Sequence, residues 1–225
     1  MEQAGLPLTN KKRGGKRDGA GRKRVKRGRE NVPHRARPRH HHAHPLLVTL
    51  RARGGLPALR HEGLYAFLRS AIHGASRSPA VGTAFRVVEF SIQDDHVHFI
   101  VEAYDTDTLS RGLRGLAIRL ARAFNRGVGI RGPVWGDRYH ARPLKTPWHV
   151  RNAIVYVLMN AKKHRHVVAR GIDSFSSAPW FRGFTVAIES PLEPRPVVDA
   201  RTWLASVGWK RRGLVSPDER PRAPD

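Results

Sequence analysis

The sequence predicts an α+β protein in which helices pack against an antiparallel β-sheet. Short segments rich in β-branched and aromatic residues indicate strands, and longer segments with apolar residues at helical spacing indicate helices. Asp94 and Asp95 form a tight-turn signal between two of the strand-like segments. So short a connection joins antiparallel strands, because parallel strands need a long crossover.

The first half of the chain predicts three strands and one helix. A strand is expected within residues 45–53, which begin with an apolar run and then alternate. Residues 60–76 predict a helix, because apolar side chains recur there at helical spacing: Leu64, Phe67, Leu68, Ala71 and Ile72. Two further strands are expected over residues 85–93 and 96–103, on either side of the tight turn.

The second half predicts two helices and a short strand. Residues 109–127 form a basic amphipathic helix. A strand is expected within residues 134–145, and then a helix from Pro147 to about His164. This β-α-β-β-α-β order is the ferredoxin-like arrangement, with helices on one face of the sheet and a C-terminal helix added. The other face of the sheet is expected to stay open for a ligand.

The composition predicts a polyanionic partner. The chain has 42 Lys and Arg against 18 Asp and Glu, a net charge of +24 and a pI near 11.7. Residues 1–39 contain 14 of these basic residues and almost no large apolar ones, so residues 1–44 are expected to form a disordered basic arm. A folded domain is then expected over residues 45–166, and a partly structured extension over residues 167–225.

Several classes of protein are excluded. The chain has no cysteine, which excludes disulfide scaffolds, thiolate zinc sites, iron–sulfur clusters and a cysteine nucleophile. No apolar run approaches the roughly 20 residues of a membrane-spanning helix, and the first residues do not resemble a signal peptide. The basic arm lacks the bulky apolar face needed for membrane insertion. We therefore expect a cytoplasmic protein without a membrane partner, associated with the nucleoid when bound to DNA.

Two histidines on one predicted strand are candidate metal ligands. His96 and His98 flank Val97, so both imidazoles lie on the same face of the sheet and are able to hold a divalent metal. An ordinary polar sheet surface is the alternative, because such pairs arise easily in a chain with 13 histidines. Two other groups of histidines are weaker candidates, one in an expected solvated linker and one poorly aligned on a helix: residues 40–44, and His164 with His166.

The last predicted helix adds a tyrosine and an amide. Its apolar stripe is formed by Val150, Ala153, Ile154, Val157, Leu158 and Ala161. Tyr156 lies off this stripe, and Asn160 follows one turn later, so the two side chains project in one direction. Two histidines and Asn160 would hold Mg²⁺ or Mn²⁺, and Tyr156 would attack a phosphate that the metal polarises. The alternative is a surface tyrosine that makes a hydrogen bond.

A second tyrosine has a strongly basic neighbourhood. Tyr139 is surrounded in sequence by Arg138, Arg142 and Lys145, which suits stacking on a base or contact with a phosphate backbone. It is therefore the alternative nucleophile. Together with two lysines of the last helix, this segment gives the candidate DNA-binding set: Arg138, Tyr139, Arg142, Lys145, Lys162 and Lys163.

Three stretches resemble the single-tyrosine HUH transposases, in particular the REP-associated tyrosine transposases. They are HRARPRHHHAHPLLVTLR, DDHVHFIVEA and VWGDRYHARPLKTPWHVRNAIVYVLMNAKKH, and the resemblance extends from about residue 34 to residue 180. HUH denotes two histidines around an apolar residue, which matches His96 and His98. In this family the catalytic tyrosine is followed four residues later by a metal-binding Gln or Asn, a spacing that falls here on Tyr156 and Asn160.

One departure concerns the catalytic helix. Related proteins commonly read Tyr-Ile-x-x-Asn-Pro, whereas this chain has Val157 after the tyrosine and Ala161 after the asparagine. An alanine lets the helix continue where a proline would disturb it. The spacing from Tyr156 to Asn160 is unaffected.

The resemblance implies that residues 45–166 form a ferredoxin-like nuclease domain. Such a domain cuts single-stranded DNA beside a hairpin, forms a 5′-phosphotyrosine link, and uses Mg²⁺ or Mn²⁺ without an external energy source. The alternative is a non-catalytic single-stranded nucleic-acid-binding protein, either a domesticated transposase or an RNA-binding module. RNA-binding sheets display aromatic residues, whereas residues 96–103 offer His96, His98, Ile100 and Glu102 on the relevant face. The sequence leaves open whether the protein is a monomer or a homodimer.

Overall fold

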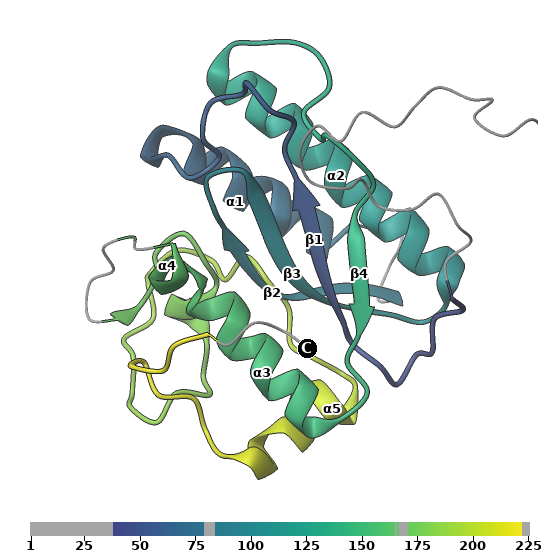
Figure 1. Ribbon diagram of the computed structural model, residues 1–225, viewed down its shortest axis with the longest axis vertical. Helices are drawn as coiled ribbons and strands as arrows, with labels where there is room; N and C mark the ends of the chain where they lie inside the picture. The colour runs from purple at the N-terminus through teal and green to yellow at the C-terminus, as the bar shows by residue number, and fades with distance from the viewer. Residues whose placement is uncertain (1–37, 79–83, 165, 167–170, 222–225) are drawn as a thin grey trace, which may run out of the picture. The chain divides into compact units, whose positions relative to one another are not determined.

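Four strands form an antiparallel sheet in the order β2-β3-β1-β4, and Figure 1 shows them side by side in this order. The computed structural model describes residues 38–78, 84–164, 166 and 171–221, all within one unit, Val32–Asp225. The elements are β1 (Leu46–Arg51), α1 (Glu62–Ser76), β2 (Phe85–Ile92), β3 (His96–Ala103), α2 (Thr106–Val128), β4 (His140–Pro143), α3 (Pro147–Leu158), α4 (Asn160–Lys163), η3 (Ala178–Trp180), α5 (Trp203–Ser206) and η4 (Gly208–Arg212). The predicted α+β fold with a ferredoxin-like strand order is confirmed.

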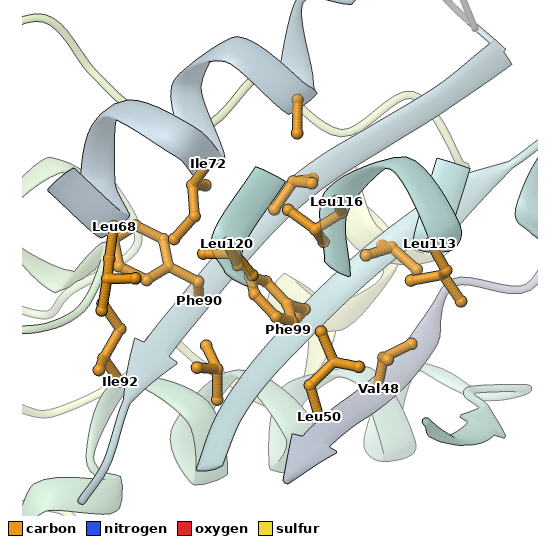
Figure 2. Close-up of a cluster of buried hydrophobic side chains, with 14 of the residues drawn as sticks. Val48, Leu50, Leu68, Ile72, Phe90, Ile92, Phe99, Leu113, Leu116 and Leu120 are labelled. Carbon is orange, nitrogen blue, oxygen red and sulfur yellow. The ribbon is translucent and has the colours of Figure 1, made fainter. Parts of the chain in front are cut away.

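The first face of the sheet packs against α1 and α2. Val97, Phe99 and Val101 alternate along β3 and point into this core, which Figure 2 shows between the helices and the strands. Both helices begin at a side-chain cap, because His61 accepts a hydrogen bond from the backbone of α1 and Asp105 from that of α2. These caps and the shared core fix the helices on one side of the sheet.

The second face of the sheet is covered by α3 and the C-terminal segment. Leu47, Val88 and Ile100 of the sheet form a second core with the apolar stripe of α3, together with Phe181 and Trp209. The prediction that this face stays open for a ligand is therefore wrong. The physical reason is that α3 carries its own apolar stripe, which needs a partner, and the sheet offers apolar residues on this face as well.

Strand β2 contains a bulge. The register with β3 pairs Val87 with Val101 but Glu89 with Ile100, so Val88 is an additional residue. The bulge reverses the alternation of side chains along β2. After it, Phe90 points into the first core, while Glu89 and Ser91 pair with β3 residues of the second face.

The last predicted helix is interrupted once. Helix α3 ends at Leu158, Met159 adopts a turn conformation, and α4 begins at Asn160. The predicted single helix from Pro147 to about His164 is therefore two helices, separated by one residue. All six residues of its predicted apolar stripe are buried, so the helical spacing itself is confirmed.

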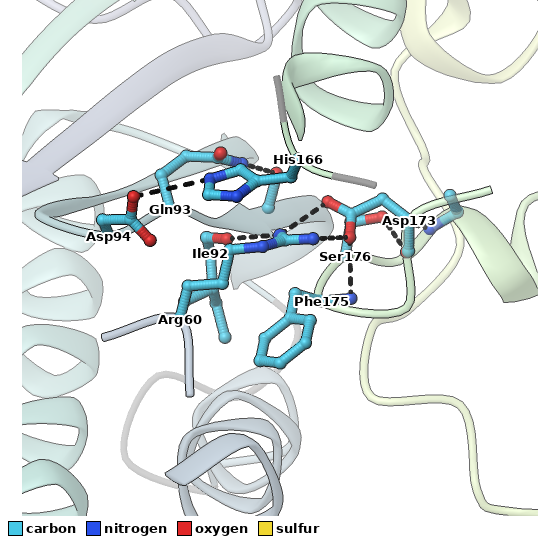
Figure 3. A network of polar contacts seen from close by, with 10 residues as sticks. Arg60, Ile92, Gln93, Asp94, His166, Asp173, Phe175 and Ser176 are labelled. Carbon is cyan, nitrogen blue, oxygen red and sulfur yellow. Dashed lines mark hydrogen bonds and ion pairs between the residues drawn. The ribbon is translucent and has the colours of Figure 1, made fainter. Parts of the chain in front are cut away.

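The chain after α4 is tied back to the sheet by a buried ion pair. The guanidinium of Arg60 donates to both carboxylate oxygens of Asp173, at 3.0 and 2.6 Å, and also to the backbone oxygen of Ile92 (Figure 3). The same guanidinium lies 4.4 Å from the ring centre of Phe175. Thus the C-terminal segment is anchored beside the turn between β2 and β3.

Two predictions fall partly outside the described residues: the basic arm over residues 1–44 and the extension over residues 167–225. The basic arm predicted over residues 1–44 is described only from residue 38 onward. There, His40 is half-buried, its backbone N–H donates a hydrogen bond to the Thr106 hydroxyl oxygen, and its ring contacts the backbone oxygen of Ala103. Within the described part of the chain, no helix is long and apolar enough to cross a membrane.

Candidate active site on the second face of the sheet

The two candidate metal ligands sit in the middle of the sheet. Strand β3 pairs with β2 on one side and with β1 on the other, and the register places Thr49 opposite His98 and Arg51 opposite His96. Both imidazoles therefore project from the second face, on which α3 packs. They are 5% and 3% exposed, so the surrounding protein fixes their orientation.

Each imidazole is held through its Nδ1 atom. His96 Nδ1 lies 2.5 Å from a carboxylate oxygen of Asp95, and His98 Nδ1 lies 2.9 Å from the hydroxyl of Thr49. Burial raises the pKa of Asp95, but the hydrogen bond to His96 and the charge of Arg51 outweigh it and lower this pKa, so the carboxylate only accepts. Nδ1 of His96 must then carry the hydrogen, which leaves its Nε2 as a lone-pair donor.

The two Nε2 atoms face each other at 3.0 Å. Two lone pairs at this distance repel, so either a hydrogen or a cation has to lie between the rings. Burial lowers the pKa of His96, and burial lowers the pKa of His98 well below the usual value, with the neighbouring His96 and His164 adding to the effect. Both rings are therefore neutral near pH 7, which is the form that binds metal.

Tyr156 lies against this histidine pair. Its ring centre is 4.9 Å from that of His98, in an edge-to-face arrangement, and the ammonium of Lys163 lies 5.3 Å from the Tyr156 ring centre. Helix α3 positions the tyrosine, because Thr146 caps its first turn and its apolar stripe packs on the sheet. Thus α3 brings the predicted nucleophile to the predicted ligands.

Asn160 is the third predicted ligand, and its side chain is fully buried. Neither the amide oxygen nor the amide nitrogen has a hydrogen-bond partner among the described residues. A buried amide that is left unpaired costs about 1–3 kcal/mol, so it needs an explanation such as a bound ion. The polar face that Asn160 is expected to share with Tyr156 is therefore buried at Asn160.

His164 is a site residue that sequence reasoning undervalued. Its ring centre lies 5.4 Å from that of His96, at the end of the segment that begins with Tyr156. His166 lies nearby, with its Nε2 atom 3.5 Å from the Asp94 carboxylate in the β2–β3 turn (Figure 3). The helical spacing of His164 from Tyr156 and Asn160 gave a usable signal, since the three follow one another at four-residue intervals.

The donor set is consistent with one divalent cation. Two neutral imidazoles and a buried amide oxygen are ordinary ligands for Mn²⁺ and acceptable ones for Mg²⁺. Among the described residues, no three or more His, Cys, Asp or Glu side chains form a cluster able to hold a metal.

The predicted DNA-binding residues are not gathered at one place. Arg138 and Lys145 are exposed on either side of β4, and Arg142 lies on the second face, because it pairs with Leu47. Lys163 is exposed beside Tyr156, whereas the ammonium of Lys162 is bound to the backbone oxygen of Pro217. These residues border the candidate site from β4 on one side and from α4 on the other.

The alternative nucleophile lies away from the histidines. Tyr139 directly precedes β4 and packs against the first core with Ala141, on the side of α1 and α2. Tyr65 packs against the same core, and burial raises its pKa. Tyr104 is 71% exposed after the end of β3. Tyr156, in contrast, contacts the His96–His98 pair through the ring of His98.

Two supporting residues were missed, and one of them depends on strand pairing. Thr49 reaches His98 only through the register of β1 with β3, which the sequence does not reveal. Asp95 was interpreted as part of a turn, and its carboxylate also holds His96. Its position directly before the His-x-His pair was the available signal.

Comparisons with known proteins support the fold. No family model matches the chain, and no curated protein matches it in sequence. Among solved structures, the fold is similar to that of a REP-associated tyrosine transposase bound to a REP hairpin. The two chains share 20% sequence identity with a TM-score of 0.51, over 65% of this chain and 82% of the other.

Proposed function

We propose that this protein cleaves and rejoins single-stranded DNA, with Tyr156 as the nucleophile and a divalent metal held by His96, His98 and Asn160. The observation that carries this proposal is the contact between Tyr156 and a buried pair of neutral imidazoles whose Nε2 atoms face each other. The protein of similar fold is bound to a DNA hairpin. This supports hairpin-containing DNA as the substrate and DNA transposition as the biological reaction.

The residues around the metal ligands would keep the site ready for binding. Asp95 and Thr49 hold the Nδ1 side of the two rings, so that each Nε2 points to the same place. The amide oxygen of Asn160 would supply the third donor. Mg²⁺ or Mn²⁺ bound there would polarise the scissile phosphate and neutralise part of its charge.

Tyr156 would carry the covalent step. Its hydroxyl oxygen attacks the phosphorus, the bond from phosphorus to the 3′ oxygen breaks, and the phenolic proton is released while the departing 3′ oxygen takes up a proton. The products are a 5′-phosphotyrosine and a free 3′-hydroxyl, so the bond energy is kept for rejoining. The ammonium of Lys163 lies 5.3 Å from the Tyr156 ring centre and would neutralise part of the charge of the attacked phosphate.

The basic residues around β4 and α4 would hold the DNA backbone. Arg142 lies on the same face as the histidines, and Lys145 and Arg138 flank the same edge strand. Lys163 would approach phosphates from the α4 side, whereas Tyr139 packs against the first core and the Lys162 ammonium is bound to the backbone oxygen of Pro217. Because β4 is the edge strand, a DNA strand has access to it.

The proposal is tested with a labelled single-stranded hairpin library, incubated with the protein in Mn²⁺ or in EDTA and separated on a denaturing gel. We expect a covalent protein–DNA band in Mn²⁺ that is absent in EDTA. Tyr156→Phe and His98→Ala should abolish this band. Tyr65→Phe is the matched control, because the Tyr65 hydroxyl lies against the first core without a hydrogen-bond partner among the described residues, so the band should remain intact.

Two outcomes would overturn the assignment. If Tyr139→Phe removed the covalent band and Tyr156→Phe did not, the nucleophile would be the tyrosine on the other side of the sheet. If native gels showed DNA complexes but no denaturing gel showed a covalent band with any metal, the protein would be a non-catalytic binder of single-stranded nucleic acid.

A further inference from the structure

A cavity of about 410 Å³ lies at the far end of β3 from the histidines. Tyr104 and Trp203 contribute aromatic surface to its lining, and Arg86 and Arg201 contribute guanidinium groups. Glu102 also lines this cavity, and it projects from the same face of β3 as His98. Glu102 lies four residues after His98, so the two positions are about 13 Å apart along the strand. The cavity is therefore separate from the candidate active site but on the same side of the sheet.

The aromatic residues of this cavity are unusually exposed. Tyr104 is 71% and Trp203 is 48% exposed, although large apolar rings are normally buried in the core. His42 lines the same cavity, and its ring is stacked 6.3 Å from that of Tyr104. Exposed rings around a hollow offer flat apolar surfaces on which a planar ligand can stack.

The position of Trp203 is fixed by a buried carboxylate. Glu102 is 4% exposed, and it accepts hydrogen bonds from the backbone N–H groups of Arg201 and Thr202 and from the Thr202 hydroxyl. Thr202 in turn caps α5, of which Trp203 is the first residue. The loop that presents the indole is thus pre-organised, which lowers the entropy cost of ligand binding.

The other contacts of Trp203 lie within its own segment. A Cβ atom on Gly208 would lie 2.7 Å from the indole, so the ring packs closely over this glycine. The guanidinium of Arg211 lies 5.0 Å from the Trp203 ring centre. The indole is therefore held in place by its own segment while nearly half of its surface remains accessible.

The charge around the cavity favours an anionic ligand. Arg201 and Arg211 are exposed, and no ion pair to either is found among the described residues. Arg86 is held by the backbone oxygen of Asp199 and by Glu102, so it serves mainly as structural support. The one carboxylate in the lining, Glu102, is already paired. A planar ring system linked to a phosphate matches these groups.

We propose that this cavity binds one unpaired base of a single-stranded DNA, stacked on Trp203 and Tyr104 with its phosphate near Arg201. This inference rests on the proposed function in one respect, namely that the ligand is DNA. With a rise of roughly 3.4 Å per nucleotide along a stacked strand, the distance of about 13 Å from His98 corresponds to roughly four nucleotides. The cavity would thus recognise a base at a fixed distance from the cleaved bond.

The test measures binding in EDTA, so it does not depend on cleavage. Fluorescence anisotropy with a fluorescein-labelled single-stranded oligonucleotide should show weaker binding by roughly 5- to 100-fold for Trp203→Ala. Trp203→Phe should recover most of the affinity. Trp148→Ala is the matched control, because Trp148 is similarly exposed on α3. Tyr104→Ala should also weaken binding. Because Tyr104 is largely exposed, this variant should remain folded, so its weaker binding would come from the lost ring.

An abasic scan makes the test specific. Oligonucleotides that lack one base at a time should lose affinity for the wild-type protein at one or two positions, and Trp203→Ala should lose nothing further at those positions. Equal losses in both proteins at every position would overturn the proposal. So would a free mononucleotide that binds as tightly as the strand, because the cavity would then be a small-molecule site. Loss of the covalent band alone, with binding intact, would refute the cleavage proposal and leave this one standing.

Discussion

At the scale of single residues, the candidate site contains polar groups that lower the stability of the folded protein. Asn160 buries an amide without a hydrogen-bond partner among the described residues, and His96 and His98 bring two Nε2 atoms to 3.0 Å. Neither arrangement improves packing. Both are expected where a protein keeps ligand atoms free for a cation, because strained or unpaired groups concentrate at functional sites.

Asn160→Leu should separate stability from function. Leucine has a similar size and removes two unpaired polar atoms, so we expect the free energy of unfolding in EDTA to rise by about 1 kcal/mol. Formation of the covalent DNA product in Mn²⁺ should fall at least about 10-fold, because a ligand is lost. Thermal unfolding and the denaturing gel measure the two effects. Asn152→Leu is the control, since Asn152 is only half-buried on α3.

A decrease in stability for Asn160→Leu in EDTA would contradict this prediction, because it would mean that the amide is already paired in the folded protein. Mn²⁺ should in addition stabilise the wild-type protein against heat and leave Asn160→Leu less affected, as any ligand that binds only the folded state does.

Much of the residue-level chemistry could be read from the sequence. The His-x-His pair, Tyr156 and Asn160 are defined by alternation along a strand and by spacing along a helix. Thr49 could not be predicted, because it meets His98 across a strand pairing whose register has no local signature. Local periodicity therefore identified residues within elements, and the contacts between elements remained hidden.

At the scale of the elements, the bulge in β2 decides which side chains reach the second face. Without Val88 as an extra residue, regular alternation from Phe85 would direct Glu89 into the apolar core. With it, Glu89 contacts the hydroxyl of Ser177, and Ser91 pairs with His98. Two adjacent valines in an otherwise alternating strand were the only sign of this bulge in the sequence.

The buried carboxyl of Glu89 should make stability depend on pH. Burial raises its pKa from 4.5 to about 7, opposed by the Ser177 hydrogen bond and by Arg195, and reinforced by Asp199. The folded protein therefore binds this proton more tightly than the unfolded chain does. This stabilisation is complete below pH 4.5 and is lost as the pH rises through about 7. The free energy of unfolding should fall by about 3 kcal/mol over this range.

Glu89→Gln should remove this contribution to the pH dependence of stability, because glutamine stays neutral and keeps a hydrogen-bonding group beside Ser177. Urea unfolding at pH 5 and pH 8 measures the difference. We expect a smaller loss of stability between these two pH values in the variant than in the wild type, while Glu189→Gln, at an exposed position, should behave as the wild type. An unchanged pH slope in Glu89→Gln would mean that other groups cause it.

The helix boundaries illustrate a second limit of sequence reasoning. The apolar stripe from Val150 to Ala161 runs through the break at Met159 without a change in spacing. Periodicity therefore predicts one helix, although the structure has two helices separated by the turn at Met159. A break in a helix cannot be predicted from the pattern of apolar residues when the spacing of the buried residues continues unchanged across it.

At the scale of the whole described unit, distant segments meet around the β2–β3 turn. The Arg60–Asp173 pair joins the start of α1 to the segment after α4, and its side chains are only 8% and 1% exposed. His166 and Asp94 come together at the same place (Figure 3). The C-terminal segment is thus part of the support for the histidine pair, a relation that the sequence does not reveal because the two partners are 113 residues apart.

Asp173→Ala should be strongly destabilising, because it leaves a buried guanidinium without its counter-ion. We expect a loss of about 3–5 kcal/mol in the free energy of unfolding, measured by urea denaturation. The double variant Arg60→Met with Asp173→Leu should lose much less, since no buried charge remains. If the double variant were as unstable as Asp173→Ala, the packing of this segment and not the ion pair would be the main contribution.

The central position of β3 has a consequence for how this protein can change over evolutionary time. Side chains alternate along a strand, so adding or deleting one residue in the turn at Asp94 and Asp95 would turn both imidazoles into the apolar core. Loops elsewhere tolerate changes in length. In the turn between β2 and β3, by contrast, the number of residues can change only by an even number if both imidazoles are to stay on the second face. The shortest connection in the sheet is therefore the segment least free to vary, although it contacts no substrate itself.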